Sequence, residues 1–237
     1  MITLVIFDLI LIKKNIILKT SLIIVKYYPV FAIFGFLSMA IFRIPLFFNK
    51  KLQFYKLMGT GKNGTFDKIP DLSQWAILVT YEGDLNLNTQ FGSFILKWFD
   101  LFCKKQTIYI LKPIEGHGLW DQKKVFGNLP ATSNYEGEIA VLTRATIRLN
   151  KLRYFWENVA PIASQMSAAD GFINSYGVGE VPWVKQATFS VWKSKEMMKN
   201  FAYKMPQHKA VIKKTRKQKW YSEDMFTRFT IQQKIEK

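Results

Sequence analysis

The sequence predicts an α+β fold in which two ferredoxin-like units follow one another and pair as a pseudo-dimer. Each half of the chain reads strand–helix–strand and then strand–helix–strand again, which is the element order of a ferredoxin-like unit. The 237 residues, 49% of them hydrophobic and 22% charged, suffice for a substantial core. We therefore expect one unit at 1–115, a connecting segment at 116–135 and a second unit at 136–237.

In the first half, apolar β-branched runs predict strands and helical spacing predicts helices. The run 16–25 fits either a strand or a helix, and the glycine-rich stretch 59–71 predicts a loop. The expected strands are 3–12, 52–58, 74–81 and 107–111, and the expected helices are 21–42 and 89–104.

The second half repeats this order of elements after a turn-rich connection at 116–134. Ser194 is a candidate N-cap for a helix that ends at Tyr203, and Pro206 suits the first turn of the next helix. The expected strands are 138–147, 172–176, 187–192 and 227–231, the expected helices are 151–168, 195–203 and 206–219, and a loop is expected at 177–182.

Residues 29–48 form an apolar stretch whose only charge is Arg43. A membrane-spanning helix needs roughly 20 apolar residues, so a single transmembrane helix at 29–48 is one interpretation. Pro29 and Pro45 limit an uninterrupted helix to about 15 residues, and the beginning of the chain lacks the pattern of a secretory signal. We favour a helix that is buried or lies on a membrane surface.

The chain is strongly basic, with a net charge of +17, and has one cysteine, Cys103. No nucleic-acid-binding motif accompanies the charge, so we do not expect nucleic acid as a partner. The first interpretation of the basic residues is a solvated face, and the second is a contact with acidic lipid or an acidic partner. The densest basic cluster is 209–219. A single cysteine allows no disulfide within the chain and fits a cytoplasmic location, with a peripheral position at the inner membrane as the alternative.

The candidate site residues include a histidine and two arginines. His208 opens a basic helix, where imidazole can ligate haem iron or transfer a proton, or can simply be exposed. His117, between two glycines, reads as an exposed turn residue. Arg144 and Arg148 lie four apart in an expected strand and so share a face, which is either a surface with salt bridges or the wall of a cavity.

Each half of the chain contains a pair of closely spaced glycines. Gly59 and Gly61 lack the spacing of a phosphate-binding loop, so we expect them to form a tight turn near a ligand cavity. Gly177 and Gly179 have the same expected role in the second half. Hydrolase motifs are absent from the sequence.

Several unusual segments, taken in order, resemble the spheroidene monooxygenase family, which oxidises carotenoids. The resemblance is strongest over 138–229 and weakest at the amino end and over 85–107. The segments are FYKLMGTGKNGTF (54–66), HGLWDQKKVF (117–126), LTRATIR (142–148), GVGEVP (177–182), FSVWKS (189–194), FAYKMPQHKA (201–210) and WYSEDMFTRF (220–229).

The resemblance implies a dimeric α+β barrel with an apolar tunnel between its halves. It implies that oxygen is inserted at C2 of a carotenoid end group to give a hydroxyl and, on repetition, a ketone. Dioxygen is the co-substrate and a donor such as ferredoxin supplies electrons. Haem is the suspected cofactor, with His208 as its axial ligand and with Arg144 and Arg148 beside it.

On this interpretation His208 and Arg144 are catalytic. The substrate pocket would be lined by Trp120, Phe189, Trp192, Gly59, Gly61, Gly177 and Gly179. Two alternatives stay open. One is a cofactor-free monooxygenase of the antibiotic-biosynthesis type. The other is a non-enzymatic lipid-binding protein that uses 29–48 at a membrane surface.

Overall fold

The structure, a computed structural model, describes residues 18–62 and 68–237. Within two helices it gives the backbone, but not the side chains, of 159–164 and 206–208. The strand expected at 3–12 lies outside the described residues.

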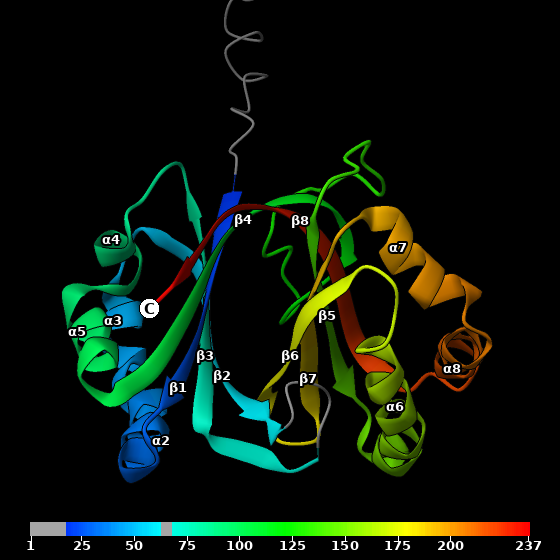
Figure 1. The fold of residues 1–237 in the computed structure, drawn as a ribbon, viewed down its shortest axis with the longest axis horizontal. Coiled ribbons are helices and arrows are strands. Elements are labelled where there is room, and N and C mark those ends of the chain that lie inside the picture. Colours follow the sequence, from blue (N-terminus) through cyan, green and yellow to red (C-terminus); the bar gives the residue numbers. More distant parts are fainter. Residues whose placement is uncertain (1–17, 63–67) are drawn as a thin grey trace, which may run out of the picture.

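The described residues form eight strands that close into one barrel, in which every strand is antiparallel to both neighbours (Figure 1). The order around the barrel is β1-β3-β2-β6-β7-β5-β8-β4. The strands are β1 (Leu18–Tyr27), β2 (Leu52–Gly61), β3 (Pro70–Glu82), β4 (Cys103–Gly118), β5 (Ile139–Ile147), β6 (Phe172–Val181), β7 (Lys185–Trp192) and β8 (Tyr221–Glu236).

Each half of the barrel has the same internal order. The first half reads β4-β1-β3-β2 and the second reads β8-β5-β7-β6, so each is a ferredoxin-like sheet. The two sheets join at their edges. β4 pairs with β8 along most of its length, whereas β2 meets β6 only at Gly59–Gly179 and Thr60–Val178. The predicted fold class is confirmed.

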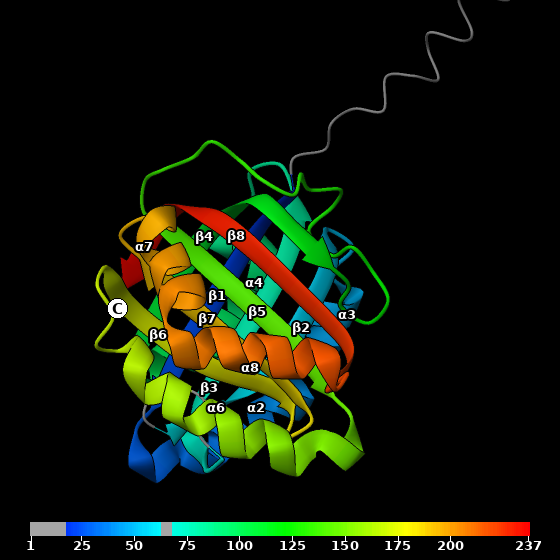
Figure 2. The same ribbon diagram turned by 90° about the vertical axis from the view of Figure 1, so that its right-hand side faces the viewer.

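The helices cover the outside of the barrel, so that each half has an outer layer (Figures 1 and 2). The first half carries η1 (Pro29–Phe31), α2 (Ala32–Ile41), α3 (Arg43–Phe48), α4 (Leu87–Phe91) and α5 (Ser93–Phe102). The second half carries η3 (Leu149–Lys151), α6 (Leu152–Met166), α7 (Lys195–Lys199), the π-helix η4 (Asn200–Lys204) and α8 (Pro206–Lys217).

Alternation along the strands decides which side chains face inward. In β1, Leu22 and Ile24 join a core cluster inside the barrel, while Ile23, Val25 and Tyr27 pack in a second cluster beneath the helices. The inner cluster draws buried residues from both halves. It includes Met58, Leu78, Tyr109, Trp120, Phe126, Leu142, Val178, Phe189, Met225 and Phe229.

The first half of the chain departs from the prediction in one important place. The helix expected at 21–42 begins only at Pro29, because residues 18–27 form β1, a central strand buried on both faces. Such a strand has no polar alternation, so its sequence cannot be told from that of a buried helix.

Glycine and proline misled three further predictions. The expected loop at 177–182 is mostly the end of β6, and Gly59 and Gly61 belong to β2. β4 continues past Pro113 to Gly118 because the register shifts at that point, and a bulge tolerates proline.

The helix signals of the second half are confirmed. The Ser194 hydroxyl caps α7 by accepting a hydrogen bond from the Met197 amide at 3.2 Å, and Pro206 occupies the first turn of α8. The connection contains a short bridge between Trp120 and Lys123.

The segment Pro29–Phe48 is long and apolar enough to cross a membrane by length and composition, yet only 22% of an 18-residue stretch within it is buried. One side of the segment packs on the sheet. Gly35 lies against Trp75, where an added Cβ would be 2.5 Å from the indole nitrogen. That nitrogen donates a hydrogen bond to the Leu72 carbonyl at 2.8 Å, so the ring is held in place.

Gly35→Ala should therefore lower the free energy of unfolding by about 1–3 kcal/mol, because the methyl group overpacks the contact between α2 and β3. Gly59→Ala is the matched control, since its Cβ would meet the same tryptophan at an ordinary 3.5 Å. Urea denaturation measures both variants. Equal stability of the two would contradict the close packing of α2.

Candidate functional site

A buried arginine lies inside the barrel at the end closed by the connecting segment. Arg144 projects inward from β5 and its side chain is only 1% exposed. Its guanidinium forms an ion pair with Glu223 of β8 and approaches Glu180 of β6 at 3.5 Å and Asp121 at 3.7 Å. Three elements of the second half and the connection therefore converge on one cation.

The acids around Arg144 also bind two lysines and a tryptophan. Lys56 of β2 pairs with both Asp121 and Glu180, and Lys185 of β7 lies 3.1 Å from Asp121. The Trp120 indole donates to Glu180 at 2.8 Å, beneath the Arg144 guanidinium at 5.7 Å from the ring centre. We call Lys56, Asp121, Arg144, Glu180, Lys185 and Glu223 the barrel charge cluster.

The cluster shifts the pKa values of Glu223, Asp121 and Lys56 towards their charged forms. Burial alone raises the pKa of Glu223, but the amides of Gln122 and Asp121 and the Arg144 guanidinium bring it below its usual value. Burial likewise raises the pKa of Asp121, and Lys56 and Lys185 outweigh that effect and lower it. The pKa of Lys56 is raised, because Asp121 and Glu180 outweigh its burial.

Three cations meet three anions in this cluster, and the contacts cross from the first half to the second. An ion-pair network of this kind favours a single conformation of the chain. Its cations and anions also neutralise one another, so little net charge remains to act on a substrate. The arrangement therefore indicates a structural role in closing the barrel. The predicted catalytic role of Arg144 stays a prediction.

Arg148 does not share the position of Arg144. β5 ends at Ile147, and Arg148 follows it as an exposed residue before η3. The expectation of two arginines on one strand face is wrong for this reason. The sequence also gave no notice of Lys56, Asp121 and Glu223. The alternation of Glu223 with Met225 and Thr227 is the strand signal that could have placed it in β8.

A second buried ion pair fixes the start of α7. Arg228 of β8 pairs with Glu115 of β4, which is only 1% exposed. Lys195, the first residue of α7, lies 3.4 Å from the same carboxylate and donates to the Ser133 carbonyl. These contacts hold α7 and the connecting segment against the seam between β4 and β8.

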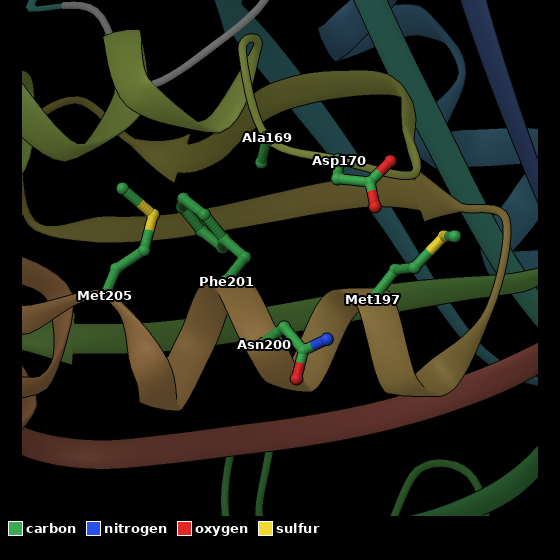
Figure 3. A pocket seen from close by; sticks show the side chains of 6 residues that line it. All are labelled: Ala169, Asp170, Met197, Asn200, Phe201 and Met205. Atoms are coloured by element: carbon green, nitrogen blue, oxygen red, sulfur yellow. The ribbon is translucent and has the colours of Figure 1, made fainter.

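Further along the chain from Lys195, an apolar hollow of about 210 Å³ lies between the α7–η4 segment and the turn before β6 (Figure 3). Met197, Phe201 and Met205 supply its apolar lining, and Asn200 and Asp170 supply polar groups. Ala169 completes the lining. The π-helical turn η4 widens the helix here, a geometry that is frequent at functional sites.

A glycine keeps this hollow open. Gly171 has φ of +74°, and a Cβ there would come within 2.6 Å of the Met197 Cβ. A side chain at 171 would therefore push Met197, which lines the hollow. This position needs glycine for both its backbone conformation and its close approach.

The predicted site residues fall into three places. Trp120 and Phe189 lie inside the barrel, and Gly59 and Gly179 pair at the seam between β2 and β6. Gly61 and Gly177 lie in the same two strands. Trp192 lies on the outer side of β7, with its ring 5.3 Å from Phe201. Trp192 therefore backs the hollow, whereas the other six do not line it.

His208 belongs to the first turn of α8, three residues after Met205, and its side chain is outside the described residues. A pocket for a whole ligand or cofactor measures roughly 300–1,000 Å³. The hollow beside η4 is smaller than this, so the described residues that line it do not form a pocket for a porphyrin. Among the described residues no cluster of His, Cys, Asp and Glu could hold a metal ion.

Among the described residues, apolar side chains from both halves pack together in the space where the tunnel was expected. A second hollow, of about 240 Å³, lies where the connecting segment crosses β4 and β8, with Val125, Phe126 and Met225 in its wall. Neither hollow has room for an entire long polyene.

Arg144→Met should lower the free energy of unfolding by about 3–5 kcal/mol, because it leaves Glu223 and Glu180 without their buried partner. Arg148→Met is the matched control and should change it by about 0.5 kcal/mol or less. Chemical denaturation measures both. A small effect of Arg144→Met would show that the cluster does not hold the barrel closed.

Acid should weaken the fold through the same cluster. The folded-state pKa values of Glu223 and Asp121 lie below their unfolded values of about 4. The stability that they contribute is therefore present above about pH 4 and is lost as the pH falls through the folded values. Unfolding curves between pH 6 and pH 2 should show a smaller loss in Glu223→Gln than in the exposed control Glu136→Gln, and equal losses would contradict this assignment.

Comparison with known proteins agrees with the sequence resemblance. No protein-family model matches the chain. The chain is 31% identical to spheroidene monooxygenase from Rubrivivax gelatinosus over 178 residues, which covers 75% of the chain and 68% of that protein. It is 29% identical to the Cereibacter sphaeroides enzyme of the same name over 192 residues, 80% of the chain but 59% of that protein's length.

Solved structures with little sequence identity share the fold. The aldoxime dehydratase OxdRE, in complex with butyraldoxime, is 8% identical and superposes over 91% of the chain and 79% of its own, with a TM-score of 0.58. A second aldoxime dehydratase gives 9% identity over 91% of the chain and 81% of its own, with a TM-score of 0.55. These likenesses concern the fold alone; the sequence identity with the Rubrivivax gelatinosus protein shows that the chain belongs to the spheroidene monooxygenase family.

Proposed function

We propose that this chain is a carotenoid monooxygenase. The observation that carries the proposal is the 31% identity with spheroidene monooxygenase over three quarters of the chain. The reaction would insert one atom of dioxygen into a C–H bond at C2 of an end group and reduce the other to water. Two electrons from a donor such as ferredoxin and two protons complete the balance. A second round at the same carbon gives a geminal diol, which loses water to leave a ketone.

The hollow beside η4 is the place that we propose for the reacting end group. Oxidation at the end of a long hydrocarbon requires that the end be enclosed, while the rest of the polyene can lie outside. A hollow of about 210 Å³ lined by Met197, Phe201 and Met205 suits an apolar segment of that kind. Methionine adapts its shape to irregular apolar groups, and Asn200 offers an amide to a product hydroxyl.

Inside the barrel the arrangement is different. The rings of Phe189 and Tyr109 are in tilted contact with their centres 5.0 Å apart, and Trp120 is fully buried beneath the barrel charge cluster. A substrate there would have to displace close-packed side chains, which costs several kcal/mol. This favours the outer layer of the second half as the substrate site.

We also propose the division into units at 1–115 and 136–237, joined by 116–135.

Haem held by His208 is the cofactor that the family resemblance implies. The hollow as described does not fit a porphyrin, so no step of the reaction is assigned to haem. That same mismatch favours the second candidate, a cofactor-free monooxygenase of the antibiotic-biosynthesis type.

Absorbance of the purified protein distinguishes these two chemistries. A haem ligated by His208 predicts a Soret band that is lost in His208→Ala and kept in the control His117→Ala. An active protein without such a band would remove haem and leave the cofactor-free candidate.

Gly171→Ala should lower carotenoid oxidation by about 10–100-fold, because the added methyl group moves Met197 within the hollow. Gly83→Ala is the matched control. Gly83 has φ of +69°, so an alanine there carries the same backbone strain of about 1–2 kcal/mol as one at 171, but its Cβ meets nothing within 4 Å. Pigment analysis of a carotenoid-producing host that expresses each variant measures the effect.

An unchanged product yield in Gly171→Ala would place the substrate elsewhere. If the wild-type protein itself left the pigments unchanged, the monooxygenase proposal would fail and the non-enzymatic lipid-binding alternative would gain support.

A further inference from the structure

The outer side of η1, α2 and α3 is apolar and faces away from the protein. Six large apolar side chains there are each between 58% and 77% exposed: Val30, Ile33, Phe36, Ile44, Phe47 and Phe48. If η1, α2 and α3 are treated as one helix with 100° per residue, the six residues lie within an arc of about 120° around its axis. We call these six residues the α2–α3 face. An apolar surface of this extent marks a site of contact with another apolar phase.

The opposite side of the same segment is bound to the sheet. Gly35, Ser38, Phe42 and Leu46 are buried there. The Tyr27 hydroxyl donates to the Ser38 hydroxyl at 3.2 Å, and Phe42 packs against Phe99 with ring centres 5.5 Å apart. A helix held in this way cannot leave the sheet to cross a bilayer without exposing Tyr27 and Phe99. It can only lie along a surface.

The charged residues next to the α2–α3 face indicate which kind of partner surface it contacts. Residues 29–51, which include the helices of this face, contain three charged residues, all of them basic: Arg43, Lys50 and Lys51. Arg43, Lys50 and Lys51 are exposed within or next to the helices that carry the α2–α3 face. A second copy of this chain would bring the same positive charge against it, on top of a net charge of +17 on each molecule.

We propose that the α2–α3 face docks the protein on the surface of a bilayer that contains anionic lipids. Exposed phenylalanine and isoleucine side chains enter the region between headgroups and acyl chains, and Arg43, Lys50 and Lys51 contact the anionic headgroups. The helices lie in the plane of the interface and stay packed on the barrel. This proposal does not depend on the carotenoid reaction.

Vesicle sedimentation tests the docking without any substrate. The wild-type protein should bind vesicles of phosphatidylglycerol and phosphatidylcholine at least about tenfold more tightly than vesicles of phosphatidylcholine alone. The double variant Ile33→Ser and Phe47→Ser should bind the anionic vesicles at least about tenfold more weakly, with unchanged circular dichroism.

The matched control changes two exposed apolar residues of the second half, Leu149→Ser and Tyr154→Ser, which are 74% and 51% exposed. Its binding should equal that of the wild-type protein. Should the apolar variant unfold, Lys50→Gln with Lys51→Gln provides the second test, with binding reduced only on anionic vesicles.

Four results would overturn the proposal. The wild-type protein could remain unbound in the presence of anionic vesicles. The control could lose as much binding as the α2–α3 variant. The protein could form a dimer in lipid-free solution that Ile33→Ser and Phe47→Ser dissociates, which would assign the face to a second copy. Protein that resists extraction from membranes by alkaline carbonate would likewise show a spanning helix.

Discussion

The pairing of free sheet edges is the constraint on which the structure depends. Each four-stranded sheet leaves two edges, β2 and β4 in the first half and β6 and β8 in the second, and unpaired edges favour aggregation. Joining β4 to β8 and β2 to β6 removes all four edges at once. The two inner faces must then meet, so their side chains fill the space between them and the helices are left outside.

This closure separates the packed interior of the barrel from its outer layers. The barrel interior holds an apolar core capped by a charge cluster in which three cations face three acids, and the cluster links β2 to β6 close to their short seam. The outer layers are free to differ. In the first half the outer layer is densely aromatic and exposes an apolar face, and in the second half it contains the hollow beside η4. The two features lie on opposite sides of the barrel (Figure 1).

Much of the fold could be predicted from the sequence, because half-buried strands alternate and surface helices have a period of 3.6 residues. β1 was partly misread as helix because both of its faces are buried. The charge cluster could not be foreseen, since Lys56, Asp121 and Glu223 are distant in the sequence and meet only once the barrel closes. Gly59 and Gly179 looked like loop residues, although they pair where two strands approach closely. Trp192 lies behind Phe201 and does not line the hollow, so its role in a substrate pocket stays a prediction.

The central claim is that a carotenoid end group binds in the outer layer of the second half and not within the barrel. A crystal structure of the protein with a bound acyclic carotenoid tests it most directly. The account predicts the end of the polyene between Met197, Phe201 and Met205, with Phe189 and Trp120 unmoved. Electron density for the polyene inside the barrel, with Phe189 or Trp120 displaced, would contradict it.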